Sequence, residues 1–213
     1  MSQSLREILG STRPILMAIV GEGGALASGR AARGGADIVQ VRARQIPSRA
    51  LMRLVREVIA EVGDAGRVIV NSRPDIAERA GAGGVHLPES GLDPRAVRRA
   101  FPGLCVSVSR HDRLGVERAV AEGADFVILG PVFMTPGKGV HALGASGLGA
   151  ALSGLGARVI AVGGITALNA SGISGCGASG IAAIRPFADP VRAGIEASLF
   201  RESLDASFRA SRG

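Results

Sequence analysis

The chain alternates between two hydrophobic patterns along almost its whole length. Short apolar runs, rich in valine and isoleucine, are followed by glycine, asparagine or serine and then by segments with helical spacing. This succession is typical of repeated strand–helix units. Eight runs are predicted to be strands: residues 15–20, 37–42, 67–71, 84–87, 104–109, 125–129, 158–162 and 179–184.

The segments between these runs have the spacing of helices with one buried face. In residues 48–62, apolar residues from Leu51 to Val62 recur at i, i+3, i+4 and i+7, which places them on one side of a helix. Pro74 and Pro94 stand where a first helical turn would begin. Helices are predicted at residues 26–33, 48–62, 74–80, 94–101, 113–121, 146–153 and 167–174, and from 190 towards 208.

Eight parallel strands that alternate with eight helices predict an α/β fold of the (β/α)8, or TIM, barrel class. No linker or low-complexity tract interrupts the 213 residues, so we expect one domain over residues 1–213. The main alternative is an open doubly wound sheet, which often carries a G-x-G-x-x-G turn after its first strand. Here that turn reads GEGGAL, and Leu26 replaces the third glycine.

Composition excludes several other classes of protein. Hydrophobic residues make up 46% of the chain, enough for a substantial core. No apolar run approaches the ~20 residues of a membrane-spanning helix. The first ten residues lack the pattern of a secretory signal, so we expect a cytoplasmic protein. Cys105 and Cys176 are too few for a disulfide framework or a zinc site.

The basic charge is explained better by anionic small molecules than by nucleic acid. The formal net charge is +7 and the isoelectric point is about 11.2. The arginines are scattered, and the chain has no tryptophan or tyrosine on which bases could stack. We therefore expect neither a nucleic-acid partner nor a membrane partner. A homodimer is left open.

In a barrel of this class, catalytic groups come from the carboxyl ends of the strands and from the loops that follow. His111 follows the fifth strand, and an imidazole with a pKa of about 6.5 can accept and return a proton at neutral pH. An exposed loop histidine is an equal interpretation. His86 can instead be a hydrogen-bonded core residue, and His141 an ordinary loop residue. Polar side chains that could bind a substrate follow the same strand ends: Gln40, Arg42, Arg44, Asn71, Ser109, Thr135 and Lys138.

Turns after the seventh and eighth strands indicate a phosphate site. Gly163 and Gly164 permit close backbone approach, and together with Ile184 and Arg185 they offer N–H groups near a helix start. A tight strand-to-helix turn without a ligand is the alternative. Lys138, the only lysine in the chain, lies in a glycine-bounded loop where it could meet a phosphate, or it is a solvated surface residue.

Six short motifs, in order along the predicted strands, resemble the thiamine phosphate synthase superfamily, which includes the TenI-type thiazole tautomerases. Each motif alone is a weak signal, whereas six in order are specific. The similarity covers nearly the whole chain and implies a barrel that holds a thiazole phosphate at the turns 163–164 and 184–185. The motifs are QVRAR at 40–44 for Q-L-R-x-K, NSRPDIA at 71–77 for N-D-R-x-D-x-A, GVHL at 84–87, SRH at 109–111 for S-x-H, GPVFMT at 130–135 with Lys138 for G-P-x-F-x-T-x-x-K, and GGI at 163–165.

The resemblance also implies a metal site that the sequence does not complete. Synthases of the superfamily join a pyrimidine diphosphate to the thiazole phosphate, release pyrophosphate, and hold Mg²⁺ with two aspartates. Ser72 and Gly91 occupy those two positions, and neither supplies a hard anionic oxygen. Glu89 or Asp93 would have to rescue the metal from a reshaped loop. Arg44 replaces the superfamily's lysine, which keeps the charge and changes its geometry.

Thiazole tautomerases share the barrel, need no metal, and use a histidine at the S-x-H position, which His111 matches. We therefore expect a metal-independent isomerase, a thiazole tautomerase without a cofactor, in which His111 carries the proton and a thiazole phosphate is the partner. A thiamine phosphate synthase that uses Mg²⁺ is the first alternative. A non-catalytic binder of thiamine-pathway phosphates is the second.

Overall fold

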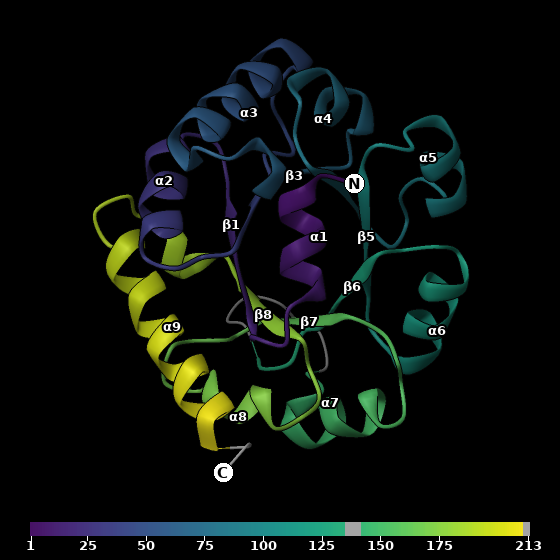
Figure 1. Cartoon of the computed structure of the whole chain (residues 1–213), viewed down its shortest axis with the longest axis vertical. Coiled ribbons are helices and arrows are strands. Elements are labelled where there is room, and N and C mark those ends of the chain that lie inside the picture. Colours follow the sequence, from purple (N-terminus) through teal and green to yellow (C-terminus); the bar gives the residue numbers. More distant parts are fainter. Residues whose placement is uncertain (135–141, 211–213) are drawn as a thin grey trace.

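The computed structural model describes residues 1–134 and 142–210, and within them it shows a closed barrel of eight parallel strands (Figure 1). The strands follow one another around the barrel in chain order, and β1 closes the barrel by pairing with β8. This confirms the predicted (β/α)8 fold in one domain. The strands are β1 (Ile15–Val20), β2 (Ile38–Val41), β3 (Val68–Asn71), β4 (Gly84–Leu87), β5 (Cys105–Arg110), β6 (Phe126–Leu129), β7 (Val159–Val162) and β8 (Gly180–Ala183).

A helix follows each strand, and these helices surround the barrel (Figure 1). Pro74 and Pro94 lie in the first turns of their helices, as predicted. No helix in residues 1–134 and 142–210 is long and apolar enough to span a bilayer. The helices are α2 (Ala25–Arg33), α3 (Ser48–Val62), α4 (Pro74–Ala80), α5 (Pro94–Ala100), α6 (Arg113–Ala121), α7 (Gly144–Leu152), α8 (Ser171–Ser174) and α9 (Ala193–Ala210), with the 3-10 turns η1 (Ala65–Arg67) and η2 (Arg185–Phe187).

Two helices start later than the sequence pattern predicts. The predicted helix at residues 167–174 is reduced to the single turn of α8, because Oδ1 of Asn169 accepts a hydrogen bond from the Thr166 N–H at 2.8 Å and closes a turn there. The last helix starts at Ala193 instead of near residue 190. Oδ1 of Asp189 accepts the Val191 N–H at 2.8 Å and holds the chain in a turn before α9. In both places a side chain competes with the helix for backbone N–H groups.

The first ten residues form a helix that the sequence analysis did not predict. Helix α1 (Gln3–Gly10) begins after Ser2, whose hydroxyl accepts the Leu5 N–H at 3.3 Å as an N-cap. Its buried residues Leu5 and Leu9 belong to the cluster that fills the barrel interior. Figure 1 shows α1 lying across the middle of the ring of strands. The helix therefore covers the barrel interior at the amino ends of the strands, opposite the carboxyl ends where the sequence predicts the active site.

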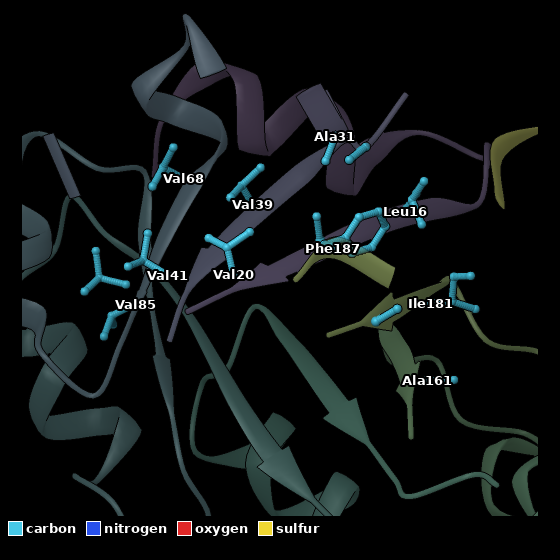
Figure 2. Packing of buried hydrophobic residues seen from close by; sticks show 14 of the residues in the cluster. Leu16, Val20, Ala31, Val39, Val41, Val68, Val85, Ala161, Ile181 and Phe187 are labelled. Atoms are coloured by element: carbon cyan, nitrogen blue, oxygen red, sulfur yellow. The ribbon is translucent and has the colours of Figure 1, made fainter. Parts of the chain in front are cut away.

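The barrel has two apolar layers because successive side chains of a strand point to opposite faces. Those that point outward, such as Leu16, Val39 and Ile181, pack against the surrounding helices, and Figure 2 shows part of this layer with Ala31 of α2 and Phe187 of η2. Those that point inward form the second layer. It comprises Ile15, Met17, Ile19, Ile38, Ile69, Cys105, Phe126, Ile128, Ile160 and Ala182, together with Leu5 and Leu9 of α1.

An ion pair attaches α9 to the barrel. Oδ2 of Asp37 accepts the Leu16 N–H at 2.7 Å and also pairs with the guanidinium of Arg201. Arg201 donates a further hydrogen bond to the Pro14 carbonyl at 2.8 Å. Only 9% of the Arg201 side chain and 22% of the Asp37 side chain are exposed. The pair therefore links the first two strands to the last helix from a largely buried position.

Candidate active site

The barrel interior becomes polar towards the carboxyl ends of β2 to β5. Nearer the amino ends, the residues that point inward are apolar. The inward positions further along carry polar side chains: Gln40 on β2, Asn71 on β3, His86 on β4, and Ser107 and Ser109 on β5, of which all but Ser109 are buried. Polar groups in an apolar core reduce stability unless they are hydrogen-bonded. A cluster of them at the end of a barrel where active sites form marks a candidate site.

Gln40, Asn71 and Ser72 form a short chain of hydrogen bonds at this end. Nε2 of Gln40 donates to Oδ1 of Asn71 at 3.2 Å, and Nδ2 of Asn71 donates to Oγ of Ser72 at 2.7 Å. Ser72 has a left-handed backbone with φ of 64°. Oε1 of Gln40 is buried and accepts no hydrogen bond from any residue that the structure describes. A donor on a bound substrate would satisfy this oxygen.

His86 lies between two hydroxyl groups of the neighbouring strand. Its Nδ1 is 3.0 Å from Oγ of Ser107, and its Nε2 is 2.8 Å from Oγ of Ser109. Burial, together with the positive charges of Arg42 and Arg44, lowers the pKa of His86 to about 3. His86 is therefore a neutral, hydrogen-bonded residue of the interior. It also fixes Ser109, one of the predicted substrate-binding residues.

Arg42 and Arg44 follow the end of β2. The Arg42 side chain is partly buried and that of Arg44 is exposed. Burial lowers the pKa of Arg42, and the neighbouring charge of Arg44 adds to this effect. Within residues 1–134 and 142–210, no carboxylate pairs with either guanidinium. Together with their effect on His86, this places uncompensated positive charge at the polar end of the barrel.

His111 follows β5 and lies against two neighbouring loops. Its Nδ1 contacts the carbonyl oxygen of Gly130, and its Nε2 is 3.6 Å from Oε2 of Glu89. The side chains of His111 and Glu89 are 55% and 54% exposed. The structure therefore gives His111 an oriented and accessible ring, next to a carboxylate to which the sequence analysis assigned only a rescue role for the metal. Its catalytic role stays a prediction.

Packing explains the two glycines of the predicted phosphate turn. Gly163 and Gly164 have positive φ of 103° and 63°. A Cβ on Gly163 would lie 2.6 Å from Cβ of Pro131, and one on Gly164 would lie 2.7 Å from Cβ of Phe133. The turn therefore needs glycine to pack against the segment after β6. Phosphate binding at this turn stays a prediction.

The expected helix start next to this turn is absent, because α8 begins only at Ser171. After β8, the partly exposed Ile184 leads into the 3-10 turn η2, which begins with the exposed Arg185. Among the other predicted residues, Thr135 and Lys138 lie outside the described residues, as does His141.

The residues present do not supply the donor set that magnesium prefers. Ser72 has a hydroxyl that already accepts a hydrogen bond from Asn71. A Cβ on Gly91 would lie 2.9 Å from the Pro88 carbonyl oxygen, so the backbone would have to move to admit any side chain there. Asp93 caps α5 by accepting the Arg95 N–H at 2.8 Å. In the described part of the chain, no group of three or more aspartate, glutamate, histidine or cysteine residues could hold a metal ion.

Comparison with known proteins identifies the family. Residues 23–187 match the family model described as thiamine monophosphate synthase. The chain belongs to this family. It is 40% identical over 163 residues to a putative thiamine-phosphate synthase of Geobacter sulfurreducens, which covers 74% of this chain and 76% of that protein. It is 36% identical over 204 residues to the thiamine-phosphate synthase of Anaeromyxobacter dehalogenans, covering 92% and 89%.

Solved structures support the fold. The thiamine phosphate pyrophosphorylase of Pyrococcus furiosus matches with a TM-score of 0.80 at 22% identity, over 92% of this chain and 98% of that chain. A 3-hexulose-6-phosphate synthase matches with a TM-score of 0.70 at 20% identity, over 89% and 99%. At these identities the likeness shows the barrel fold alone.

The relatives correct the function expected from the sequence. The expectation of a thiazole tautomerase, an isomerase, is wrong, since the similar proteins at 36% to 41% identity are named thiamine-phosphate synthases. The error came from the lost aspartates at positions 72 and 91. The loss of these two carboxylates bears on metal binding and does not by itself indicate the tautomerase reaction.

Proposed function

We propose that this chain is a thiamine-phosphate synthase, a transferase that joins a pyrimidine diphosphate to a thiazole phosphate. In this reaction the bond between the pyrimidine's methylene carbon and the diphosphate oxygen breaks, and its electron pair leaves with pyrophosphate. The thiazole nitrogen supplies the electron pair of the new C–N bond, so no oxidant or reductant is needed. The site must therefore bind two anions, align them and stabilise charge on the leaving group.

The observation that carries this proposal is the buried polar cluster at the carboxyl end of the barrel. It lies where barrel enzymes hold their substrates, and it contains an unsatisfied acceptor, Oε1 of Gln40. The guanidinium groups of Arg42 and Arg44 beside the cluster pair with no carboxylate in the described part of the chain, and they favour anionic substrates. Membership of the thiamine monophosphate synthase family supports the same substrates.

Roles for the remaining residues follow from their places around this cluster. Gln40, Asn71 and Ser109 bind the polar edges of the substrates, and Arg42 and Arg44 bind the diphosphate. His111, whose Nδ1–H donates to the Gly130 carbonyl, presents its Nε2 to the substrates. The phosphate of the thiazole is bound by the turns that contain Gly163, Gly164, Ile184 and Arg185, with Thr135 and Lys138 as further ligands.

The test is direct formation of product. The purified chain is incubated with pyrimidine diphosphate and thiazole phosphate, with and without Mg²⁺, and thiamine phosphate and pyrophosphate are quantified by chromatography and a coupled phosphate assay. We expect equal amounts of the two products. If neither product forms under any of these conditions while the protein is folded by circular dichroism, the proposal is wrong.

A substitution at the centre of the cluster links this activity to the site. Gln40→Met keeps the length of the side chain and removes its hydrogen-bonding groups. We expect it to lower kcat/KM by about tenfold or more, since a lost hydrogen bond to a substrate costs about 1.4 kcal/mol. Gln3→Met is the matched control, because Gln3 is exposed on α1 and its side chain donates a hydrogen bond to Glu7, on the same helix and away from the cluster. An unchanged kcat/KM in Gln40→Met would place the substrate elsewhere.

A further inference from the structure

The diphosphate of the proposed reaction brings several negative charges to the end of the barrel. We infer that Arg42 and Arg44 balance this charge in place of a divalent cation, so that pyrophosphate binding and turnover do not depend on Mg²⁺. This inference rests on the proposed function for its ligand. It follows from three features of this chain: the positions of the missing carboxylates, the engagement of the carboxylates in the loops after β3, β4 and β5, and two guanidinium groups that pair with no carboxylate among the described residues.

The two positions where family members are expected to hold magnesium cannot do so here. Ser72 offers a neutral hydroxyl, and one of its lone pairs already accepts the Asn71 amide at 2.7 Å. At Gly91 the backbone N–H donates to the Pro88 carbonyl at 2.9 Å, and the space for a Cβ is taken by that same carbonyl. A side chain at position 91 would therefore require a different loop. Magnesium demands near-ideal octahedral geometry and hard, usually anionic oxygen ligands.

The carboxylates in the loops after β3, β4 and β5 are engaged elsewhere. Asp75 forms a two-point ion pair with Arg73, at 2.6 and 2.8 Å, and this pair lowers the pKa of Asp75. Asp93 caps α5 at 2.8 Å, and Asp112 caps α6 by accepting the Gly115 N–H at 2.7 Å.

Glu89, the last of these carboxylates, faces Nε2 of His111 at 3.6 Å. Within these three loops, a metal would therefore have to displace a helix cap or an ion pair to gain a second carboxylate. Such a rearrangement would remove interactions that stabilise the loops themselves.

Arg42 and Arg44 differ from these carboxylates, because neither guanidinium is neutralised by an ion pair with a described residue. Burial lowers the pKa of Arg42, and repulsion from the Arg44 guanidinium lowers it further. Their field also reaches the neutral ring of His86 at the polar end of the interior. A bound diphosphate would remove the repulsion, and its oxygen atoms match the forked donors of two guanidinium groups. The side chains of Arg42 and Arg44 therefore favour an anion at this end of the barrel even when no ligand is bound.

Calorimetry with inorganic pyrophosphate tests the inference without requiring turnover. The full chain is titrated at constant ionic strength, once in EDTA and once with excess Mg²⁺. We expect binding in EDTA, with an affinity that Mg²⁺ does not raise, since the magnesium complex presents less charge to the arginines. Binding that appears only with Mg²⁺, or that Mg²⁺ strengthens, would overturn the inference.

Charge-removing variants identify the binding groups. Arg42→Gln and Arg44→Gln should each weaken pyrophosphate binding in EDTA by about tenfold or more. Arg56→Gln removes the same charge from an exposed position of α3 that forms no ion pair within residues 1–134 and 142–210, and it should leave the affinity unchanged. If all three variants bind as tightly as the natural chain, or if all three weaken equally, the arginine pair is not the binding site.

The two proposals fail in different ways. Absence of thiamine phosphate both in EDTA and in Mg²⁺ refutes the synthase function, while pyrophosphate binding in EDTA that depends on Arg42 and Arg44 would still support cation-free recognition of the anion. Turnover that occurs in Mg²⁺ and stops in EDTA confirms the synthase function and overturns the inference. Turnover in both conditions supports both proposals.

Discussion

The protein should lose stability in mild acid because His86 stays neutral inside the barrel. Burial, with the charges of Arg42 and Arg44, lowers the pKa of His86 to about 3 in the folded chain, whereas the unfolded chain has a value of about 6.5. Between these two values the unfolded chain takes up a proton that the folded chain does not. The free energy of unfolding therefore falls as the pH drops below about 6.5, by about 1.4 kcal/mol per pH unit, until the pH nears 3.

At pH 5 this loss amounts to about 2 kcal/mol, from 1.5 pH units at about 1.4 kcal/mol each. The chain has no tryptophan or tyrosine, so urea unfolding is followed by far-ultraviolet circular dichroism at about pH 7.5 and about pH 5. His86→Gln removes the titrating group and retains a polar end near Ser109. The natural chain should lose about 2 kcal/mol more than the variant over this interval.

Asp75 and Asp205, whose arginine partners lower their pKa values, lose their charge only below this interval, and the comparison between the two proteins cancels any contribution that they make. Equal losses in the natural chain and in His86→Gln would refute the assignment of a neutral buried imidazole. Nuclear magnetic resonance of the His86 ring gives a second measurement that needs no variant. Its ring signals should not titrate above about pH 4.

Three further substitutions test the fold. Asp37→Ala removes the closer carboxylate partner of Arg201, which keeps Asp205 at 3.4 Å, and removes the acceptor of the Leu16 N–H, so it should lower the free energy of unfolding by about 1 to 3 kcal/mol in urea; a loss under 1 kcal/mol would show that the pair is solvated. Leu5→Ala should cost about 2 to 4 kcal/mol, because Leu5 fills the interior from α1, and an unchanged urea midpoint would mean that α1 does not stay docked. Gly164→Ala combines a φ of 63° with a 2.7 Å contact to Phe133, so it should lower the melting temperature; an unchanged melting temperature would contradict the turn geometry.

The strand–helix alternation could be predicted because the local spacing of hydrophobic residues differs between strands and helices. Each strand must bury an outward row such as Val39 and Val41 under a helix, and that requirement leaves a run of apolar residues in the sequence. Helix α1 could not be predicted in this way. Only Leu5 and Leu9 of that helix are buried, and their position depends on an open barrel end that no local pattern describes.

The sequence could predict which residues lie at the candidate site, but not which of them contact one another. Gln40, Asn71 and Ser109 stand at strand ends in the sequence, and the barrel brings them to the same end. Ser107 was missed, although it lies two residues before Ser109 and so on the same face of β5. The pairing of His86 with Ser107 depends on the register between β4 and β5, and sequence spacing does not reveal that register.

Metal ligands and reaction type are separate properties of this barrel, and the wrong prediction came from joining them. What a diphosphate leaving group requires is positive charge placed where negative charge develops. A divalent cation supplies that charge compactly but needs fixed oxygen ligands, which Ser72 and Gly91 cannot provide. Guanidinium groups supply it from the protein itself, and Arg42 and Arg44, beside the polar end of the interior, have no carboxylate partner among the residues that the structure describes. The missing aspartates therefore argue against a bound cation, and they leave the transfer of the pyrimidine to the thiazole available to this chain.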